Sequence, residues 1–190
     1  FQTEKSAFER VASELGMIRH PEFPNRYARH PLVYLVEAAD DICYEIMDIE
    51  DAFKLRLLTF DETKALLLAF LPKHRQERAL NDVFTMVTDT NEQIAYLRSA
   101  VIGTLITACA TTFVEHEEDI LAGKFQKSLI NKLPEPLQNA YATCAKIAVP
   151  KIYKSQEVLD VELAGYRIIS ELLETLIDAT SNPTKAYSKQ

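Results

Sequence analysis

From Arg29 to Phe53 the chain reads RHPLVYLVEAADDICYEIMDIEDAF. Pro31 is favoured as the first residue of a helix, and the apolar residues that follow recur at spacings of three and four. This spacing predicts a helix that starts at Pro31 and buries one face. The predicted buried face consists of Leu32, Leu35, Ala39, Ile42, Ile46, Ile49 and Phe53.

A second face of the same predicted helix is acidic. Between Glu37 and Asp51 there are seven carboxylates and no Lys, Arg or His. Like charges at helical neighbour spacing cost about 0.2 to 0.5 kcal/mol per pair, so this excess needs a reason. One interpretation is a solvated face, and the other is a face covered by a cation or a donor-rich ligand, which Val33 and Tyr44 within it favour. The acidic row consists of Asp40, Tyr44, Asp48 and Asp51, with Glu37 and Asp41 at its flanks.

The segment RHPLVYLVEAADDICYEIMDIEDA resembles the signature of the deoxyguanosinetriphosphate triphosphohydrolases, a branch of the HD-domain phosphohydrolases. Weaker similarity covers FQTEKSAFERVASELGM before it and IYKSQEVLDVELAGYRII near the end. In that family a His, a His-Asp pair and a later Asp hold a divalent metal ion, and the resemblance makes Asp40 this last ligand. It also implies that Tyr44 lies against the substrate sugar and that Asp48 accepts a hydrogen bond from the deoxyribose 3′-hydroxyl.

The family's other metal ligands are expected upstream of this chain. No His-Asp dipeptide occurs in the sequence, His20 is the only His before Arg29, and the chain begins at Phe1 rather than Met. We therefore expect the carboxy-terminal part of a longer enzyme, inactive on its own, with its catalytic residues elsewhere. The expected organisation is residues 1–58 from the HD catalytic core, 59–180 as a helical region packed on it, and 181–190 as a mobile tail.

Composition supports an all-α fold, and the resemblance implies that the chain is an HD-domain-like fragment. The chain has 190 residues, of which 47 % are hydrophobic and only 4 are Gly, and it lacks a Gly-rich phosphate loop. A net charge of -7 argues against broad nucleic-acid binding. No uninterrupted apolar run approaches the roughly 18 residues of a membrane span. Cys43, Cys109 and Cys144 are interpreted as reduced core thiols of a cytoplasmic protein.

Two basic clusters flank the acidic helix. Residues 19–31, RHPEFPNRYARHP, carry three prolines and predict an ordered connector whose cations either neutralise the helix or bind triphosphate. The second cluster opens a predicted helix over 73–87, and its single imidazole, His74, is expected to face solvent. The connector contributes Arg19, His20, Arg26, Arg29 and His30, and the second cluster contributes Lys73, His74, Arg75 and Arg78.

Further helices are predicted on both sides of these clusters. A first helix should start at Thr3 or Ser6 and end at Gly16, and a short one capped by Asp61 should end near Pro72 and bury the leucines at 66–68 and 71. A long helix over 92–121, capped by Asp89 or Asn91, carries Arg98, which we expect to contact triphosphate or another subunit, or to pair with a carboxylate. After a linker at 124–133, helices are predicted over 134–149 and 160–179, with 152–158 extended or irregular. The predicted apolar face of the last helix contains Val161, Ala164, Ile168, Leu172, Thr175 and Leu176.

The resemblance implies metal-dependent hydrolysis of a deoxynucleoside triphosphate to the deoxynucleoside and triphosphate, by a homo-oligomer. Two alternatives stay open. The chain is a noncatalytic all-α interaction or oligomerisation module, or it belongs to an HD-type hydrolase of another phosphate ester, because a fold does not fix the substrate.

Overall fold

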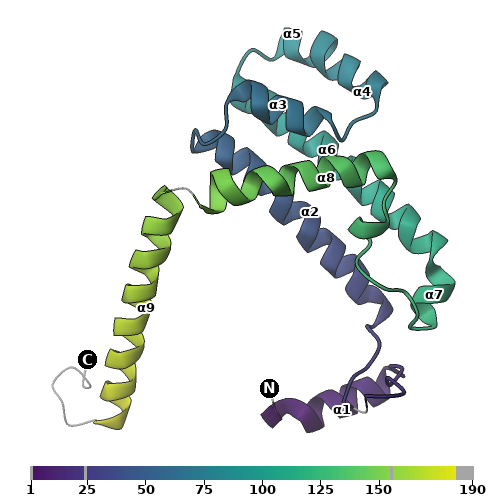
Figure 1. Cartoon of the computed structure of the whole chain (residues 1–190), viewed down its shortest axis with the longest axis vertical. Helices are drawn as coiled ribbons and strands as arrows, with labels where there is room; N and C mark the ends of the chain where they lie inside the picture. The colour runs from purple at the N-terminus through teal and green to yellow at the C-terminus, as the bar shows by residue number, and fades with distance from the viewer. Residues whose placement is uncertain (1, 24, 155, 183–190) are drawn as a thin grey trace. The chain divides into compact units, whose positions relative to one another are not determined.

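The computed structural model describes residues 2–23, 25–154 and 156–182. It is all-helical, as predicted: no strand occurs among these residues, and their only strand-like pairing is one isolated bridge between Arg19 and Tyr27. The chain divides into two compact units, residues 1–145 and 146–190 (Figure 1). The functional division proposed at residue 58 stays a prediction.

The first unit is built around two long helices, α2 (Pro31–Lys54) and α6 (Thr90–Glu115), which pack against each other. Helix α3 (Phe60–Leu68) packs on α6 and on the end of α2. The remaining elements are the 3-10 helices Gln2–Glu4 and Ile130–Lys132, α1 (Lys5–Glu14), α4 (Lys73–Arg78), the π-helical turn Ala79–Val83, α5 (Phe84–Met86), α7 (Glu117–Leu121) and α8 (Glu135–Ala148), which runs on into the second unit.

Helix α2 begins at Pro31, as predicted, and the side chain of His30 caps it by accepting a hydrogen bond from the Leu32 amide. Its predicted buried face is correct in the second half, where Ile42, Ile46 and Ile49 are buried. The first half is wrong, because Leu32, Leu35 and Ala39 are exposed and Tyr34 and Ala38 are buried instead. The cause is Tyr34. Its ring packs on Phe125 at 5.2 Å between centroids, and its hydroxyl donates to the Phe125 carbonyl at 2.9 Å.

Helix α3 is capped by Thr59, not by Asp61. The Thr59 hydroxyl accepts from the Glu62 amide while the Glu62 carboxylate accepts from the Thr59 amide, which is a complete capping box. Leu66, Leu67 and Leu71 are buried, as expected, whereas Leu68 is only half-buried. The helix predicted over 73–87 is present as α4, the π-turn and α5 in succession. His74 is exposed, as predicted.

Helix α6 starts after Asp89, whose carboxylate accepts from the Asn91 and Glu92 amides, and it ends at Glu115 rather than continuing to 121. His116 leaves helical geometry there, and α7 follows as a separate turn. Among the described residues α6 is the one helix long and apolar enough to cross a membrane by length and composition alone. Within the first unit it is a core helix, because it packs on α2 and α3 and buries Leu97, Val101 and Leu105.

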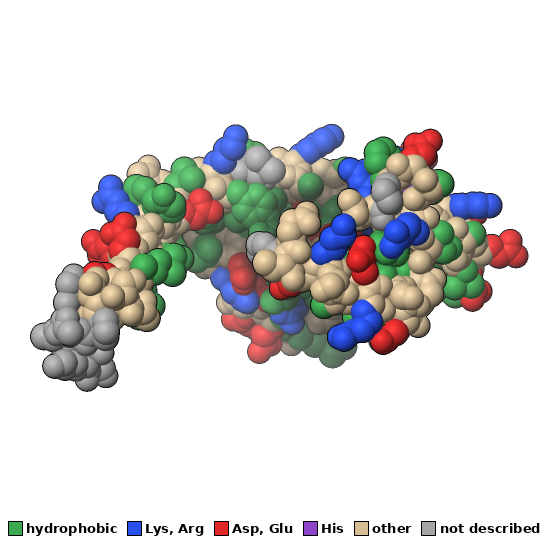
Figure 2. Space-filling model, turned by 90° about the horizontal axis from the view of Figure 1, so that it is seen from below, with side chains coloured by type: hydrophobic (Ala, Val, Ile, Leu, Met, Phe, Trp, Pro, Cys, Tyr) green, Lys and Arg blue, Asp and Glu red, His purple; other side chains and the backbone are tan. Residues whose placement is uncertain are grey.

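The second unit contains the π-helical turn Val149–Tyr153 and α9 (Gln156–Ser181). Residues 152–158 were expected to be extended or irregular, and this is wrong where they are helical, up to Tyr153 and from Gln156. Helix α9 confirms the last predicted helix and is longer at its amino-terminal end. Its apolar residues, Val161, Ile168 and Leu172 among them, are exposed, and hydrophobic side chains are visible at the surface in Figure 2. Most of the tail predicted to be mobile, residues 183–190, lies outside the described residues.

Candidate functional site

The acidic row lies on the outer side of α2, opposite the buried isoleucines. Asp40 and Tyr44 are exposed, Tyr44 to 61 %, and Asp48 is half-buried. Helical geometry places Asp48 about 12 Å from Asp40 along the axis, with Tyr44 midway between them. Val33 and Tyr44, expected to be covered, are both exposed in this chain. The row is therefore an accessible ridge on a core helix rather than part of the core.

Arg29 neutralises one end of this helix. Its Nη1 donates to the Glu37 Oε2 at 2.8 Å and to the Lys127 carbonyl at 3.2 Å, and its guanidinium lies 5.4 Å from the Tyr34 ring centroid. Burial raises the pKa of Asp41, and the neighbouring Glu37 and Asp40 raise it further. Repulsion within the row is thus only partly relieved by the connector.

Glu45 and Glu50 are carboxylates of α2 that do not belong to the predicted acidic row. Both are buried. The signal for them was present in the sequence. Glu45 lies three residues after Ile42, and Glu50 lies four residues after Ile46, so both fall on the apolar face. An acidic residue at such a position requires a partner or a proton, because an uncompensated buried charge is costly.

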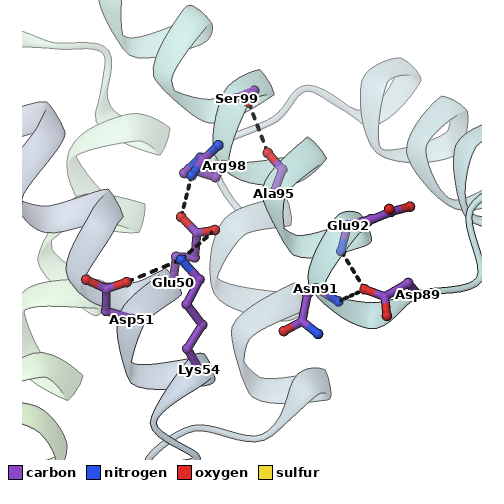
Figure 3. Close-up of polar contacts among 9 residues, drawn as sticks. All are labelled: Glu50, Asp51, Lys54, Asp89, Asn91, Glu92, Ala95, Arg98 and Ser99. Carbon is purple, nitrogen blue, oxygen red and sulfur yellow. Dashed lines mark hydrogen bonds and ion pairs between the residues drawn. The ribbon is translucent and has the colours of Figure 1, made fainter.

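Glu50 has its partners. Its Oε2 accepts from Arg98 Nη1 of α6 at 2.6 Å, and its Oε1 lies 3.3 Å from Lys54 Nζ, which also contacts Asp51 (Figure 3). Arg98 was expected either to contact triphosphate or another subunit or to pair with a carboxylate, and in the structure it pairs with the carboxylate of Glu50. The contact ties α2 to α6, and the role of Arg98 toward substrate stays a prediction.

Glu45 has no such partner. The residue is 8 % exposed, and its Oε1 accepts no hydrogen bond from any residue that the structure describes. Burial, and secondarily the charge of Asp48, raise its pKa to about 7. Across from it on α8, Tyr141 donates its hydroxyl hydrogen to the Asp41 carbonyl at 3.0 Å. Burial also raises the pKa of Cys144 on α8 to about 12, with Glu45 adding to the effect.

The cysteines follow the prediction in part. All three are free, and Cys109 and Cys144 are buried. Cys43 is exposed, so its assignment to the core was wrong. It follows Ile42 directly and lies one residue outside the buried stripe of α2.

No group of three or more metal-ligating His, Cys, Asp or Glu side chains gathers within residues 2–23, 25–154 and 156–182. A divalent ion needs several such ligands, and Asp40 supplies one. The residues present therefore do not by themselves form a complete site for the implied metal.

The fold and the ridge define an all-helical domain that exposes carboxylates and a tyrosine on one face of a core helix. No protein-family model matches the chain. Comparison with known proteins nevertheless shows that it is homologous to part of the deoxyguanosinetriphosphate triphosphohydrolase-like proteins.

One such protein, from Pseudomonas aeruginosa, is 33 % identical over 184 residues, which cover 94 % of this chain and 40 % of the relative. Another, from Synechocystis, is 34 % identical over 174 residues, which cover 91 % of this chain and 37 % of the relative. The chain thus spans less than half of the length of these curated relatives. Because the match extends over almost all of this chain, it includes α2 and its acidic row.

Proposed function

We propose that this chain is part of a metal-dependent hydrolase that converts a deoxynucleoside triphosphate to the deoxynucleoside and triphosphate. The observation that carries the proposal is the accessible row of Asp40, Tyr44 and Asp48 on α2, within a chain homologous to proteins named for this activity. In this proposal Asp40 is one ligand of a divalent metal ion, and the other ligands lie outside these 190 residues. Such an ion, when bound, would stabilise charge on phosphate oxygens.

The residues of this chain would then position the sugar. An ionised Asp48 only accepts hydrogen bonds, so it can bind a sugar hydroxyl, and Tyr44 offers both a ring face and a hydroxyl. Both lie along α2 from Asp40, which would set the distance between the sugar and the metal ligand. A 3′-hydroxyl would thereby be selected, since a substrate without it forms no charge-assisted hydrogen bond with Asp48.

The test uses the longer protein that contains this chain, assayed with a deoxynucleoside triphosphate and its 2′,3′-dideoxy analogue. The wild type should prefer the deoxy substrate by roughly 10- to 150-fold in kcat/KM, which corresponds to a charged hydrogen bond of about 1.5 to 3 kcal/mol. Asp48→Ala should lose most of this preference and keep its metal requirement. Equal use of both substrates by the wild type, or full preference in the variant, would refute the role of Asp48. The 190-residue chain alone should release no triphosphate.

A noncatalytic interaction module has one observation in its favour, the exposed apolar face of α9. That face would also suit the proposed homo-oligomer. The sequence that precedes this chain in its gene separates the two functions, because only the hydrolase requires a His and a His-Asp pair there.

A further inference from the structure

The connector before α2 and the loop after α7 enclose a cavity of about 370 Å³ whose lining contains no residue of the acidic row. The connector folds back on itself through the Arg19–Tyr27 bridge. The His20 amide donates to the Arg26 carbonyl at 2.8 Å, and the Ala28 amide donates to the Ile18 carbonyl at 2.7 Å. These bonds bring residues at both ends of the connector to one wall of the cavity.

The opposite wall comes from residues 123–127. Gly123 has φ +67°, and a Cβ at this position would lie 2.8 Å from the Ala28 Cβ, so the two loops approach as closely as a glycine allows. The Phe125 carbonyl accepts from Tyr34, and the Lys127 carbonyl accepts from Arg29. The cavity is therefore held by contacts between both loops and α2.

Cations line this cavity and carboxylates do not. Arg19, Arg26, Arg29 and Lys127 contribute four positive charges within a chain of net charge -7. Arg29 is paired with Glu37, whereas the other three form no ion pair with any described residue. Only one of the connector's cations thus neutralises the acidic helix, and a concentration of positive charge remains.

The arginine side chains are held by aromatic rings. Arg19 donates to the Tyr27 hydroxyl and lies 5.1 Å from that ring's centroid, and Arg26 lies 4.8 Å from the Phe23 centroid. His20 also lines the cavity, and its Nδ1 accepts from the Glu22 amide at 3.2 Å, so the neutral ring carries its proton on Nε2. Guanidinium groups fixed in this way match phosphate oxygens, and the rings of Tyr27, Tyr34 and Phe125 offer apolar surface beside them.

We propose that this cavity is a binding site for a small phosphate-bearing anion, either a nucleotide or an inorganic oligophosphate. None of its residues belongs to the row of Asp40, Tyr44 and Asp48. Tyr34, the residue of α2 that lines the cavity, lies six residues before Asp40, about 9 Å along the helix axis. The inference therefore rests on other residues than those of the proposed hydrolysis and does not depend on it.

The test measures binding to the 190-residue chain by isothermal titration calorimetry at 150 mM NaCl, with EDTA present to remove divalent ions. The probes are inorganic triphosphate and dATP, with sulfate as the reference anion. One saturable site is expected for the phosphates, and at least about tenfold weaker binding of sulfate. Tighter binding of dATP identifies a nucleotide site, and equal binding identifies an oligophosphate site. No saturable binding of either phosphate, or equal affinity for sulfate, overturns the proposal.

Variants locate the site. Arg19→Gln with Arg26→Gln should weaken binding about tenfold or more, the loss typical of a charge-assisted hydrogen bond. Lys127→Gln tests the opposite wall if the double variant fails to fold. Lys124→Gln removes the same charge three residues away, outside the cavity, and should change affinity less than twofold. If Lys124→Gln lost as much affinity as the cavity variants, the anion would be responding only to the net charge of the chain, and the proposed site would be wrong.

The connector variants also separate this site from the acidic row. The row carries carboxylates, and with EDTA present no cation can bridge a phosphate to them. Binding that persists unchanged in both the double variant and Lys127→Gln therefore places the phosphate elsewhere and overturns the cavity proposal. The dideoxy test of the hydrolase is unaffected by either result.

Discussion

Replacing Glu45 with Gln should stabilise the protein at pH 8 and change little at pH 5. The carboxyl is 8 % exposed, and one of its oxygens has no hydrogen-bond donor among the described residues. Its pKa is 4.5 in a model peptide and about 7 in the folded chain, raised by burial and by Asp48. In the folded state at pH 6 it therefore holds a proton that it loses on unfolding.

The sign of the pH dependence follows from linkage. Between pH 4.5 and about 7 the folded state binds more protons than the unfolded state, so the free energy of unfolding falls as pH rises. At about 1.4 kcal/mol for each tenfold change, the full difference corresponds to about 3 kcal/mol. This stability is present below pH 4.5 and is lost as pH rises through 7. Gln resembles the protonated acid and never ionises, so it avoids the loss.

Other titrating groups near Glu45 change the expected curve only slightly. The pKa of Asp41 is also raised, so the variant keeps a weaker slope of the same sign. On α6, burial and the charge of Asp41 raise the pKa of Cys109 to about 11, and on α8 that of Cys144 is raised to about 12. The pKa of Tyr141 is raised as well, mainly by burial. These three groups stay neutral between pH 5 and 8.

The assay is urea unfolding of wild type and Glu45→Gln at pH 5, 6, 7 and 8, followed by circular dichroism. The free energies of unfolding should agree within about 1 kcal/mol at pH 5, and the variant should be more stable by about 2 to 3 kcal/mol at pH 8. This corresponds to about 5 to 10 °C in Tm. Hydrogen exchange of peptides from α2 and α8 would assign the change to the first unit. Parallel curves, or a carboxyl carbon of Glu45 that titrates below pH 5.5 by NMR, would refute the reasoning.

Two further predictions test contacts of the same unit. Glu50→Gln makes the same substitution at the other buried carboxylate of α2, but we expect it to lower the free energy of unfolding. It removes the charge opposite Arg98 and should destabilise the protein by about 1 to 3 kcal/mol at pH 7 in urea unfolding, and a gain would contradict the ion pair. Gly123→Ala should cost about 1 to 3 kcal/mol, because it combines a left-handed φ with a 2.8 Å contact to the Ala28 Cβ, and should speed hydrogen exchange in residues 18–28. Gly103→Ala, with nothing within 4 Å, is its control and should be neutral or stabilising by up to about 1 kcal/mol.

Local pattern predicted the helices well, because caps and periodicity act over a few residues. Pro31, Asp89 and the isoleucines of α2 lie where the sequence placed them. One error was local, because Thr59 rather than Asp61 caps α3, and another arose where a distant residue decided the outcome. In the first turns of α2 the buried side contains Tyr34, which contacts Phe125, a residue 91 positions away that no local pattern around Pro31 includes. The partner of Glu50 is likewise 48 residues away in the sequence.

The sequence predicted which residues of the candidate site share a helix face, but it did not predict how exposed that face is. Spacing alone put Asp40, Tyr44 and Asp48 on one side of a helix, whereas their exposure depends on which elements cover α2. Glu45 and Glu50 share a helix face with the isoleucines. Assigning them to that face, rather than treating them only as part of the acidic excess, would have indicated which side of α2 is covered. The cavity beside the connector needed the structure, since residues about 100 positions apart form its walls.

The orientation of the acidic row is set by the core and requires no ligand. Contacts at three heights fix the rotation of α2 about its axis: Tyr34 with the Phe125 carbonyl, the Asp41 carbonyl with Tyr141, and Glu50 with Arg98. A helix held at three points along its length cannot turn its outer face inward without breaking at least two of them. Asp40, Tyr44 and Asp48 therefore lie along the same side of α2 in a fixed register that no ligand has to impose. Such preorganisation is what a binding face needs, because the cost of orienting its groups is met during folding rather than during binding.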